Sequence, residues 1–127
     1  MIQVNPLPTQ KIHVGACGGP DGEGPGWPVV FVASDNCTDV STIANARLQV
    51  KRPLGSDPET VTWDLTVEAG TSTRREAFYK FKGVDVAQSP PDLPVHGKYI
   101  GFVEVDFGDG IFVRFGDDMV LTVTPNP

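Results

Sequence analysis

The stretch ARLQVK at residues 46–51 alternates apolar and polar side chains at every position, and TVTWDLTVE at residues 60–68 does the same. A period of two is expected of a β-strand with one face on a core and the other in water. Between them, PLGSDP at residues 53–58 contains the Pro and Gly residues typical of a turn. We therefore expect the two stretches to pair as a β-hairpin, with Leu48 and Trp63 facing the core.

Outward from this hairpin, further short apolar segments are separated by turn residues about every 8 to 12 positions. Trp27–Ser34 is apolar and β-branched, and Gly97–Phe107 carries the longest strand signal. The spacing predicts an all-β sandwich of about seven to nine antiparallel strands. The predicted core contains Val30, Val32, Leu48, Val50, Trp63, Leu65, Val67, Tyr79, Phe81, Tyr99, Val103, Val105, Leu121 and Val123.

In the C-terminal part of the chain, glycines mark one predicted turn and one predicted interruption of a strand. Gly108-Asp109-Gly110 is typical of a tight turn between strands. Ile111–Phe115 and Met119–Thr124 are predicted as strand, interrupted by a turn or bulge at Gly116–Asp118.

The first 26 residues differ in composition from the rest. The run GACGGPDGEGPG at residues 15–26 combines glycine, which is entropically costly to order, with proline, which interrupts helices and ladders. We expect residues 1–26 to form an extended N-terminal arm, in which Ile2–Val4 and Lys11–Val14 could pair as edge strands. The sandwich domain is expected over residues 27–127.

Charge and hydropathy exclude several classes of protein. The net charge of −6 disfavours binding to the phosphate backbone of nucleic acids. The longest wholly apolar run, Val29–Ala33, is far shorter than the roughly 20 residues of a membrane-spanning helix. No signal peptide is visible, so we expect synthesis in the cytoplasm and free thiols at Cys17 and Cys37, although whether the two pair stays open. No metal or cofactor is expected.

Tyr99 follows the proline-rich segment Gln88–Pro94 and comes two residues after Gly97. In immunoglobulin-like sandwiches a tyrosine near the start of the corresponding strand bonds through its hydroxyl to the backbone just upstream. We predict that Gly97 and Tyr99 form such a structural corner. The alternative is a tyrosine that only fills core volume.

Four segments, taken in order, resemble one family. They are Val30–Asp35, Ala46–Pro53, Thr62–Val67 and Gly97–Gly110. Together they resemble the immunoglobulin-like N-terminal domain of phage baseplate upper proteins, over about four-fifths of the chain. The resemblance implies an immunoglobulin-like fold and a structural role in a bacteriophage virion.

Baseplate proteins of that family continue into long C-terminal modules, whereas this chain ends at Pro127. We therefore expect a small virion component, such as a capsid decoration, head–tail or baseplate protein. It would be made in the host cytoplasm and docked in many copies to other virion proteins.

Basic residues gather at outward positions of the predicted strands of this acidic chain. We consider them candidate docking residues for an acidic partner surface. The alternative is that their charge protects an edge strand from aggregation. They are Arg47, Lys51, Arg52, Arg74 and Arg75.

Acidic residues gather around two successive turns, and Ca²⁺ binds several carboxylates together. We interpret them as solvated turn residues, while cation binding stays open. They are Asp106, Asp109, Asp117 and Asp118.

The alternative to a structural role is a carbohydrate-binding or adhesion module, which would use exposed aromatic rings beside polar groups. The candidate rings are Phe78, Phe102, Phe112 and Phe115. We expect no enzymatic activity, because neither His13 nor His96 belongs to a motif that joins it to a nucleophile.

Overall fold

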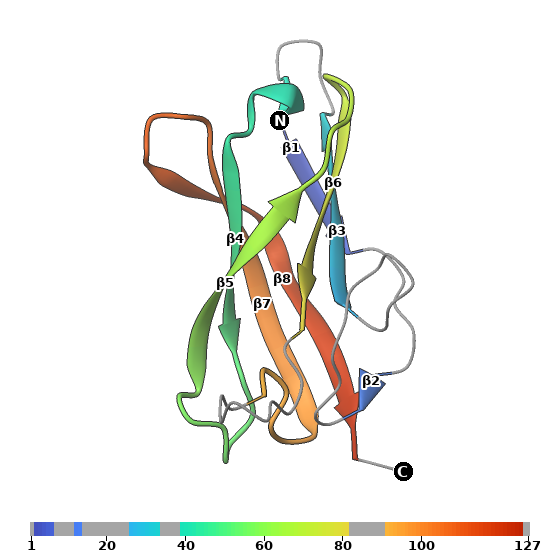
Figure 1. The fold of residues 1–127 in the computed structure, drawn as a ribbon, viewed down its shortest axis with the longest axis vertical. Coiled ribbons are helices and arrows are strands. Elements are labelled where there is room, and N and C mark those ends of the chain that lie inside the picture. The colour runs from blue at the N-terminus through green and yellow to red at the C-terminus, as the bar shows by residue number, and fades with distance from the viewer. Residues whose placement is uncertain (1, 7–11, 14–25, 34–38, 82–90, 126–127) are drawn as a thin grey trace.

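The computed structural model describes residues 2–6, 12–13, 26–33, 39–81 and 91–125, and within these ranges the chain is all-β (Figure 1). A single 3-10 turn, Val40–Thr42, interrupts the strands, and the side chain of Asp39 caps it. No α-helix occurs in the described ranges. The strands are β1 (Ile2–Pro6), β2 (Ile12–His13), β3 (Gly26–Ala33), β4 (Asn45–Lys51), β5 (Thr60–Val67), β6 (Arg74–Lys80), β7 (Gly97–Asp106) and β8 (Phe112–Thr124).

The strands form one continuous sheet in the order β1-β3-β6-β5-β4-β7-β8-β2. All neighbours pair antiparallel except β2, which runs parallel to β8. The predicted hairpin is confirmed, since β4 pairs with β5 and Leu48 lies opposite Trp63. The sheet curls until it is nearly a barrel, and β1 comes beside β8 (Figure 1). There a Cβ on Gly116 would lie 3.2 Å from the Cβ of Val4.

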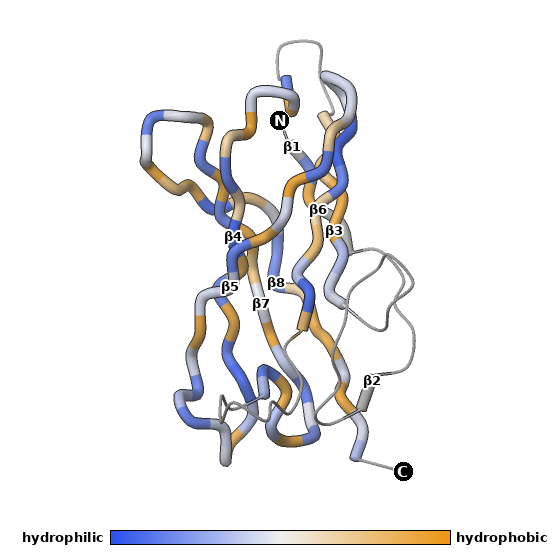
Figure 2. Tube along the Cα trace, viewed as in Figure 1, coloured by the Kyte–Doolittle hydropathy of each residue, from blue (hydrophilic) through white to orange (hydrophobic). Residues whose placement is uncertain are grey.

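The curled sheet encloses an aromatic and aliphatic core. Trp63 stacks on Tyr79 with ring centroids 4.6 Å apart, and the rings of Trp27 and Phe81 pack edge-on against it. Most of the predicted core residues are buried, while Tyr79 and Val67 are partly buried against the cluster. Hydrophobic and hydrophilic residues alternate along β4 and β5 (Figure 2).

The predicted inward face of β3 was wrong. Val29 and Phe31 are fully buried in the core together with Trp27, whereas Val32 is only half-buried. Val30 is buried but does not belong to the core cluster. The sequence of β3, GWPVVFVA, is apolar at every position, so the alternation that identifies the inner face of the other strands is missing.

Tyr99 pins the segment that leads into β7. Its hydroxyl donates to Val95 O at 2.6 Å and accepts from Val95 N at 3.4 Å, while its ring is fully buried. Burial raises the pKa of Tyr99, which keeps the phenol protonated and able to donate. Gly97 has a φ of 134°, which favours glycine, and a Cβ there would approach Pro53 Cγ to 3.0 Å. The hydrogen bond from the Tyr99 hydroxyl to Val95 O is the backbone contact that a corner tyrosine makes.

β7 and β8 form a long hairpin with a bulge. Gly101 lies opposite Met119 and Val103 lies opposite Phe115. The segment of β8 between these pairs is therefore two residues longer than the segment of β7 that it faces. Gly116, which lies in this longer segment, has a φ of 78°. The interruption predicted at this place is therefore a β-bulge within one continuous strand.

The predicted arm contributes two pieces to the sheet. β1 pairs with β3 over all five of its residues, and β2 pairs with the end of β8. Gly26 begins β3, whereas the other residues of the predicted arm, among them Cys17, and residues 34–38, with Cys37, lie outside the described residues.

Candidate functional site

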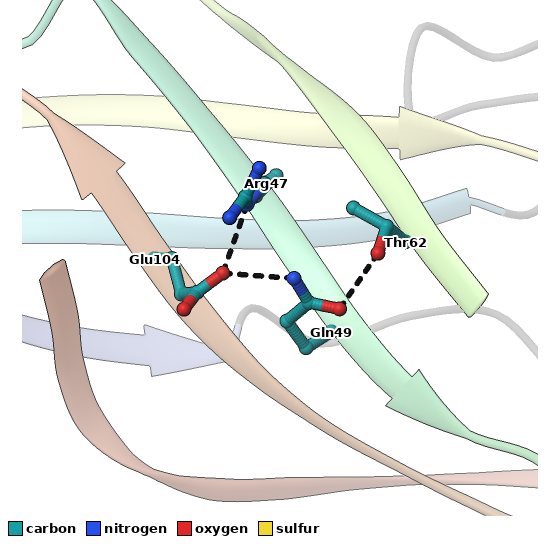
Figure 3. Close-up of polar contacts among 4 residues, drawn as sticks. All are labelled: Arg47, Gln49, Thr62 and Glu104. Atoms are coloured by element: carbon teal, nitrogen blue, oxygen red, sulfur yellow. Dashed lines mark hydrogen bonds and ion pairs between the residues drawn. The ribbon is translucent and has the colours of Figure 1, made fainter. Parts of the chain in front are cut away.

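The outward side chains of β5, β4, β7 and β8 form one continuous surface, which we call the outer face. Its centre is a polar network in which Thr62 donates to Gln49 Oε1 at 2.7 Å and Gln49 donates to Glu104 Oε1 at 2.9 Å. Arg47 Nε donates to the same Glu104 oxygen at 2.8 Å. Three neighbouring strands are thereby joined through their side chains as well as their backbones (Figure 3).

The network holds a negative charge in place. The hydrogen bond from Gln49 lowers the pKa of Glu104 most, and Arg47 lowers it further, while partial burial raises it. Glu104 therefore stays ionised at neutral pH, and its side chain is only 19% exposed. A carboxylate with two side-chain donors is held in one orientation, so the network orders the side chains in this part of the face.

Two arginines lie over aromatic rings on the same face. The guanidinium carbon of Arg47 lies 3.8 Å from the ring centroid of Phe112, and that of Arg114 lies 4.2 Å from the centroid of Phe102. Arg114 also donates to Asp118 at 2.9 Å. Each cation–π contact of this kind contributes about 0.5–1 kcal/mol at an exposed site.

The bulge in β8 shapes a hollow on the outer face. Arg114 precedes the bulge and Asp118 lies within it, and both line a groove of about 470 Å³ together with Phe102. Beside it, Ile100 of β7 and Val120 of β8 are cross-strand partners that expose 39% and 57% of their surfaces. The groove and this pair give the face a partly apolar contact surface next to ordered charges.

The loop between β7 and β8 continues this apolar character beyond the sheet. The Asp106 carboxylate accepts from the backbone N–H groups of Gly108 and Gly110, and Asp109 accepts from Ile111 N. These bonds order a loop on which Ile111 is 63% exposed. The ribbon of this hairpin projects away from the body of the sheet (Figure 1).

The predicted basic docking patch does not exist as one surface. Arg52 is 6% exposed, because its guanidinium donates to the carbonyls of Pro58 and Asp92. Arg75 is half-buried and donates to carbonyls of the 3-10 turn and of Glu68.

The other three predicted docking residues lie on two different parts of the sheet. Arg74 on β6 is exposed and lies 3.6 Å from Glu76. Arg47 is bound within the polar network, and exposed Lys51 lines the groove. Only Arg47 and Lys51 therefore belong to the outer face.

The four candidate carbohydrate-binding rings are all half-buried. Arginines lie over Phe102 and Phe112, and Phe115 packs against the core and edge-on to Phe107. Phe78 lies on β6, away from the other three. The structure therefore does not bring these rings together as one stacking platform.

The acidic turn residues are divided between the hairpin loop and the bulge. Asp106 and Asp109 bind backbone N–H groups, and Asp118 pairs with Arg114. Among the described residues, no group of three or more His, Cys, Asp or Glu side chains is placed to hold a metal ion. His96 is exposed, and the side chain of His13 lies outside the described part.

Ile100, Val120 and Arg114 were not among the residues predicted to have a function. For Ile100 and Val120 the alternation of the strands was an available signal, because they follow and precede the predicted core residues Tyr99 and Leu121. No helix in the described ranges is long and apolar enough to span a bilayer. No protein-family model matches the chain, and no curated protein matches it significantly.

Proposed function

We propose that the chain is an immunoglobulin-like β-sandwich. In that fold, strands A, B, E and D form one sheet and strands C, F and G the other. When the two-residue β2 is set aside, the remaining strands in chain order take these letters. The observed neighbours β1-β3-β6-β5 and β4-β7-β8 then correspond to A-B-E-D and C-F-G, and the additional pairing of β5 with β4 joins the two into one continuous sheet.

The core supports the same assignment. Tyr99 at the start of β7 occupies the place of the corner tyrosine on strand F. Two residues later, Gly101 stands where antibody domains carry the second cysteine of their inter-sheet disulfide. A Cβ on Gly101 would lie 3.1 Å from Trp27 Cη2, so an indole from β3 fills the space between the sheets.

We propose further that this domain is a non-enzymatic structural component of a bacteriophage virion. It acts by docking its outer face onto another virion protein, in many copies per particle. The observation that carries the docking proposal is the exposed Ile100–Val120 pair beside a groove on a face whose polar groups are already ordered. The phage assignment rests on the resemblance of the four sequence segments.

Rigidity is the physical advantage of such a face. The side chains of Arg47, Gln49 and Glu104 already hold one another, so docking would order few additional rotamers. Each immobilised long side chain otherwise costs about 0.5–1.5 kcal/mol on association. Burial of Ile100 and Val120 would then contribute about 25 cal/mol for each Å² of apolar surface removed from water.

Co-sedimentation with particles of the phage that encodes the chain tests this proposal. Val120→Lys places a charge in the contact surface and should reduce the bound fraction at least tenfold. Leu54→Lys is the matched control, because Leu54 is 85% exposed in the turn between β4 and β5. The wild-type chain failing to sediment with particles would refute virion docking. Equal loss from both variants would refute the choice of the outer face.

A further inference from the structure

β5 separates from β6 along most of its length. The two strands pair only at Thr66–Phe78 and Val67–Ala77, whereas β4 accompanies β5 from Thr60 to Leu65 on the other side. A cleft of about 530 Å³ lies along the separated part of β5.

Among the described residues, the lining indicates that the backbone edge of β5 is open from Thr60 to Asp64. Every residue from Thr60 to Asp64 lines the cleft. A strand face contributes only every second residue, so five consecutive residues must present the backbone edge of the strand. In the described part of the chain, these residues have no strand partner on that side. An open edge of this kind is a template for pairing with another extended segment.

Aromatic rings form the inner wall of the cleft. Trp63 and Tyr79 both line it, and their rings are stacked in parallel with an interplanar angle of 4°. The Tyr79 hydroxyl donates to Asp92 Oδ2 at 2.6 Å, which fixes the ring next to a buried carboxylate. Guanidinium groups stack well on such rings, and ammonium groups also bind their faces.

The charge of the lining is negative on balance. Asp57 and Asp64 are exposed at the rim, and Asp92 is buried in the wall. Arg52 is the one basic side chain among the lining residues, and its hydrogen bonds go to the backbone carbonyls of Pro58 and Asp92. A cationic group is therefore the electrostatic complement of this cleft.

We propose that the cleft binds an extended, arginine- or lysine-bearing segment of a partner protein, which adds as a strand to the open edge of β5. Its backbone would pair with Thr60–Leu65, and its basic side chains would reach Asp64, Asp57 and the ring of Tyr79. A second copy of this chain is a poor occupant, because edge-to-edge pairing of two β5 strands would bring like charges together. The site adjoins the groove beside the Ile100–Val120 pair, since Thr60 lines both, but it does not include that pair.

A pentapeptide of alternating threonine and arginine is a suitable probe, and the same peptide with citrulline in place of arginine is its neutral control. Amide NMR spectra of the folded chain should show shifts concentrated on Thr60–Leu65 and on the Trp63 indole N–H. The arginine peptide should bind more tightly than the citrulline peptide. Its affinity should fall when salt is raised, because partly exposed charges are screened.

Variants locate the charge that matters. Asp64→Asn should weaken the arginine peptide about two- to fivefold, as expected for one partly exposed ion pair. Asp117→Asn removes an exposed carboxylate at the bulge in β8 and should leave binding unchanged. Val120→Lys should also leave it unchanged, which separates this site from virion docking by the outer face.

Four results would overturn the proposal. Equal binding of the citrulline and arginine peptides would remove the role of charge. Shifts away from β5, or equal effects of Asp64→Asn and Asp117→Asn, would show attraction to the acidic surface as a whole. Shifts of the same β5 amides by neutral oligosaccharides, without any by the arginine peptide, would assign the aromatic wall to sugar binding instead.

Discussion

The substitution Arg52→Met tests whether Arg52 stabilises the fold or docks to a partner. Arg52 and its neighbour Lys51 were both predicted to point outward, yet Arg52 is 6% exposed and Lys51 is exposed. The guanidinium Nε lies 3.0 Å from Pro58 O, and Nη1 lies 3.1 Å from Asp92 O. Methionine keeps the apolar stem of the side chain but leaves these carbonyls without their donors.

The magnitude follows from those contacts. A hydrogen bond to a charged group contributes about 1.5–3 kcal/mol, and two carbonyls lose their charged donor together. Because these contributions are not additive, we expect the free energy of unfolding to fall by about 2–4 kcal/mol. With a urea dependence of about 2 kcal/mol per molar, the middle of the usual range for small proteins, the unfolding midpoint should fall by about 1–2 M. The buried Trp27 and Trp63 supply the fluorescence signal.

Lys51→Met is the matched control and should change the free energy of unfolding by less than about 0.5 kcal/mol. Arg52→Lys should fall between the wild type and Arg52→Met, because an ammonium group cannot replace the planar fork of donors. Equal urea midpoints for the Lys51 and Arg52 methionine variants would refute the structural role of Arg52. Loss of particle binding by Arg52→Met at full stability would restore its predicted role in docking.

Three further predictions concern the hairpin of β7 and β8 and the corner before it. Tyr99→Phe removes the hydroxyl bonded to Val95 and should lower the free energy of unfolding by about 1–2 kcal/mol, measured in urea. Gly101→Val overpacks the contact with Trp27 and should cost about 1–3 kcal/mol, measured by thermal unfolding. Backbone N–H donors, chiefly that of Gly108, lower the folded-state pKa of Asp106 below its ordinary value of 3.8. Its stabilisation is therefore present above pH about 4 and lost as pH falls further, so Asp106→Asn should flatten the acid-unfolding curve.

Each of these predictions has a distinct contrary result. A Tyr99→Phe variant within about 0.3 kcal/mol of the wild type would mean that ring burial alone holds the corner. Unchanged thermal stability of Gly101→Val would mean that Trp27 can move aside. An Asp106→Asn curve parallel to that of the wild type in acid would show that the carboxylate does not stabilise the hairpin loop.

Strand positions could be predicted where each strand has one wet face. β4 and β5 alternate strictly, so their bounds, pairing and inward residues agree with the structure to within one residue. β3 has no polar residue, and its inward face could not be chosen because the opposite face is also covered by protein. Alternation of apolar and polar residues identifies the inward face of a strand only where one face meets water and the other meets the core.

The fate of charged side chains was less predictable from the sequence. Arg52 and Arg75 were both predicted as outward docking residues, although each shares the parity of the inward residues of its strand, and each reaches backbone carbonyls more than thirty residues away in the chain. The long stem of arginine allows the guanidinium to travel that far from its own Cα. The cleft beside β5 could not be predicted from the sequence either, because the separation of β5 from β6 depends on how the whole sheet curls.

At the bulge, β8 has two more residues than the part of β7 that it faces, and this even number limits which insertions and deletions the hairpin can tolerate. Because two residues are added opposite β7, Phe115 and Met119 both still point inward. Removing or adding a single residue there would invert every side chain between the bulge and the hairpin tip, turning Arg114 toward the core. Insertion or deletion of two residues would keep each side chain on its present face of the sheet. The number of residues in the bulge should therefore differ among homologues by even numbers.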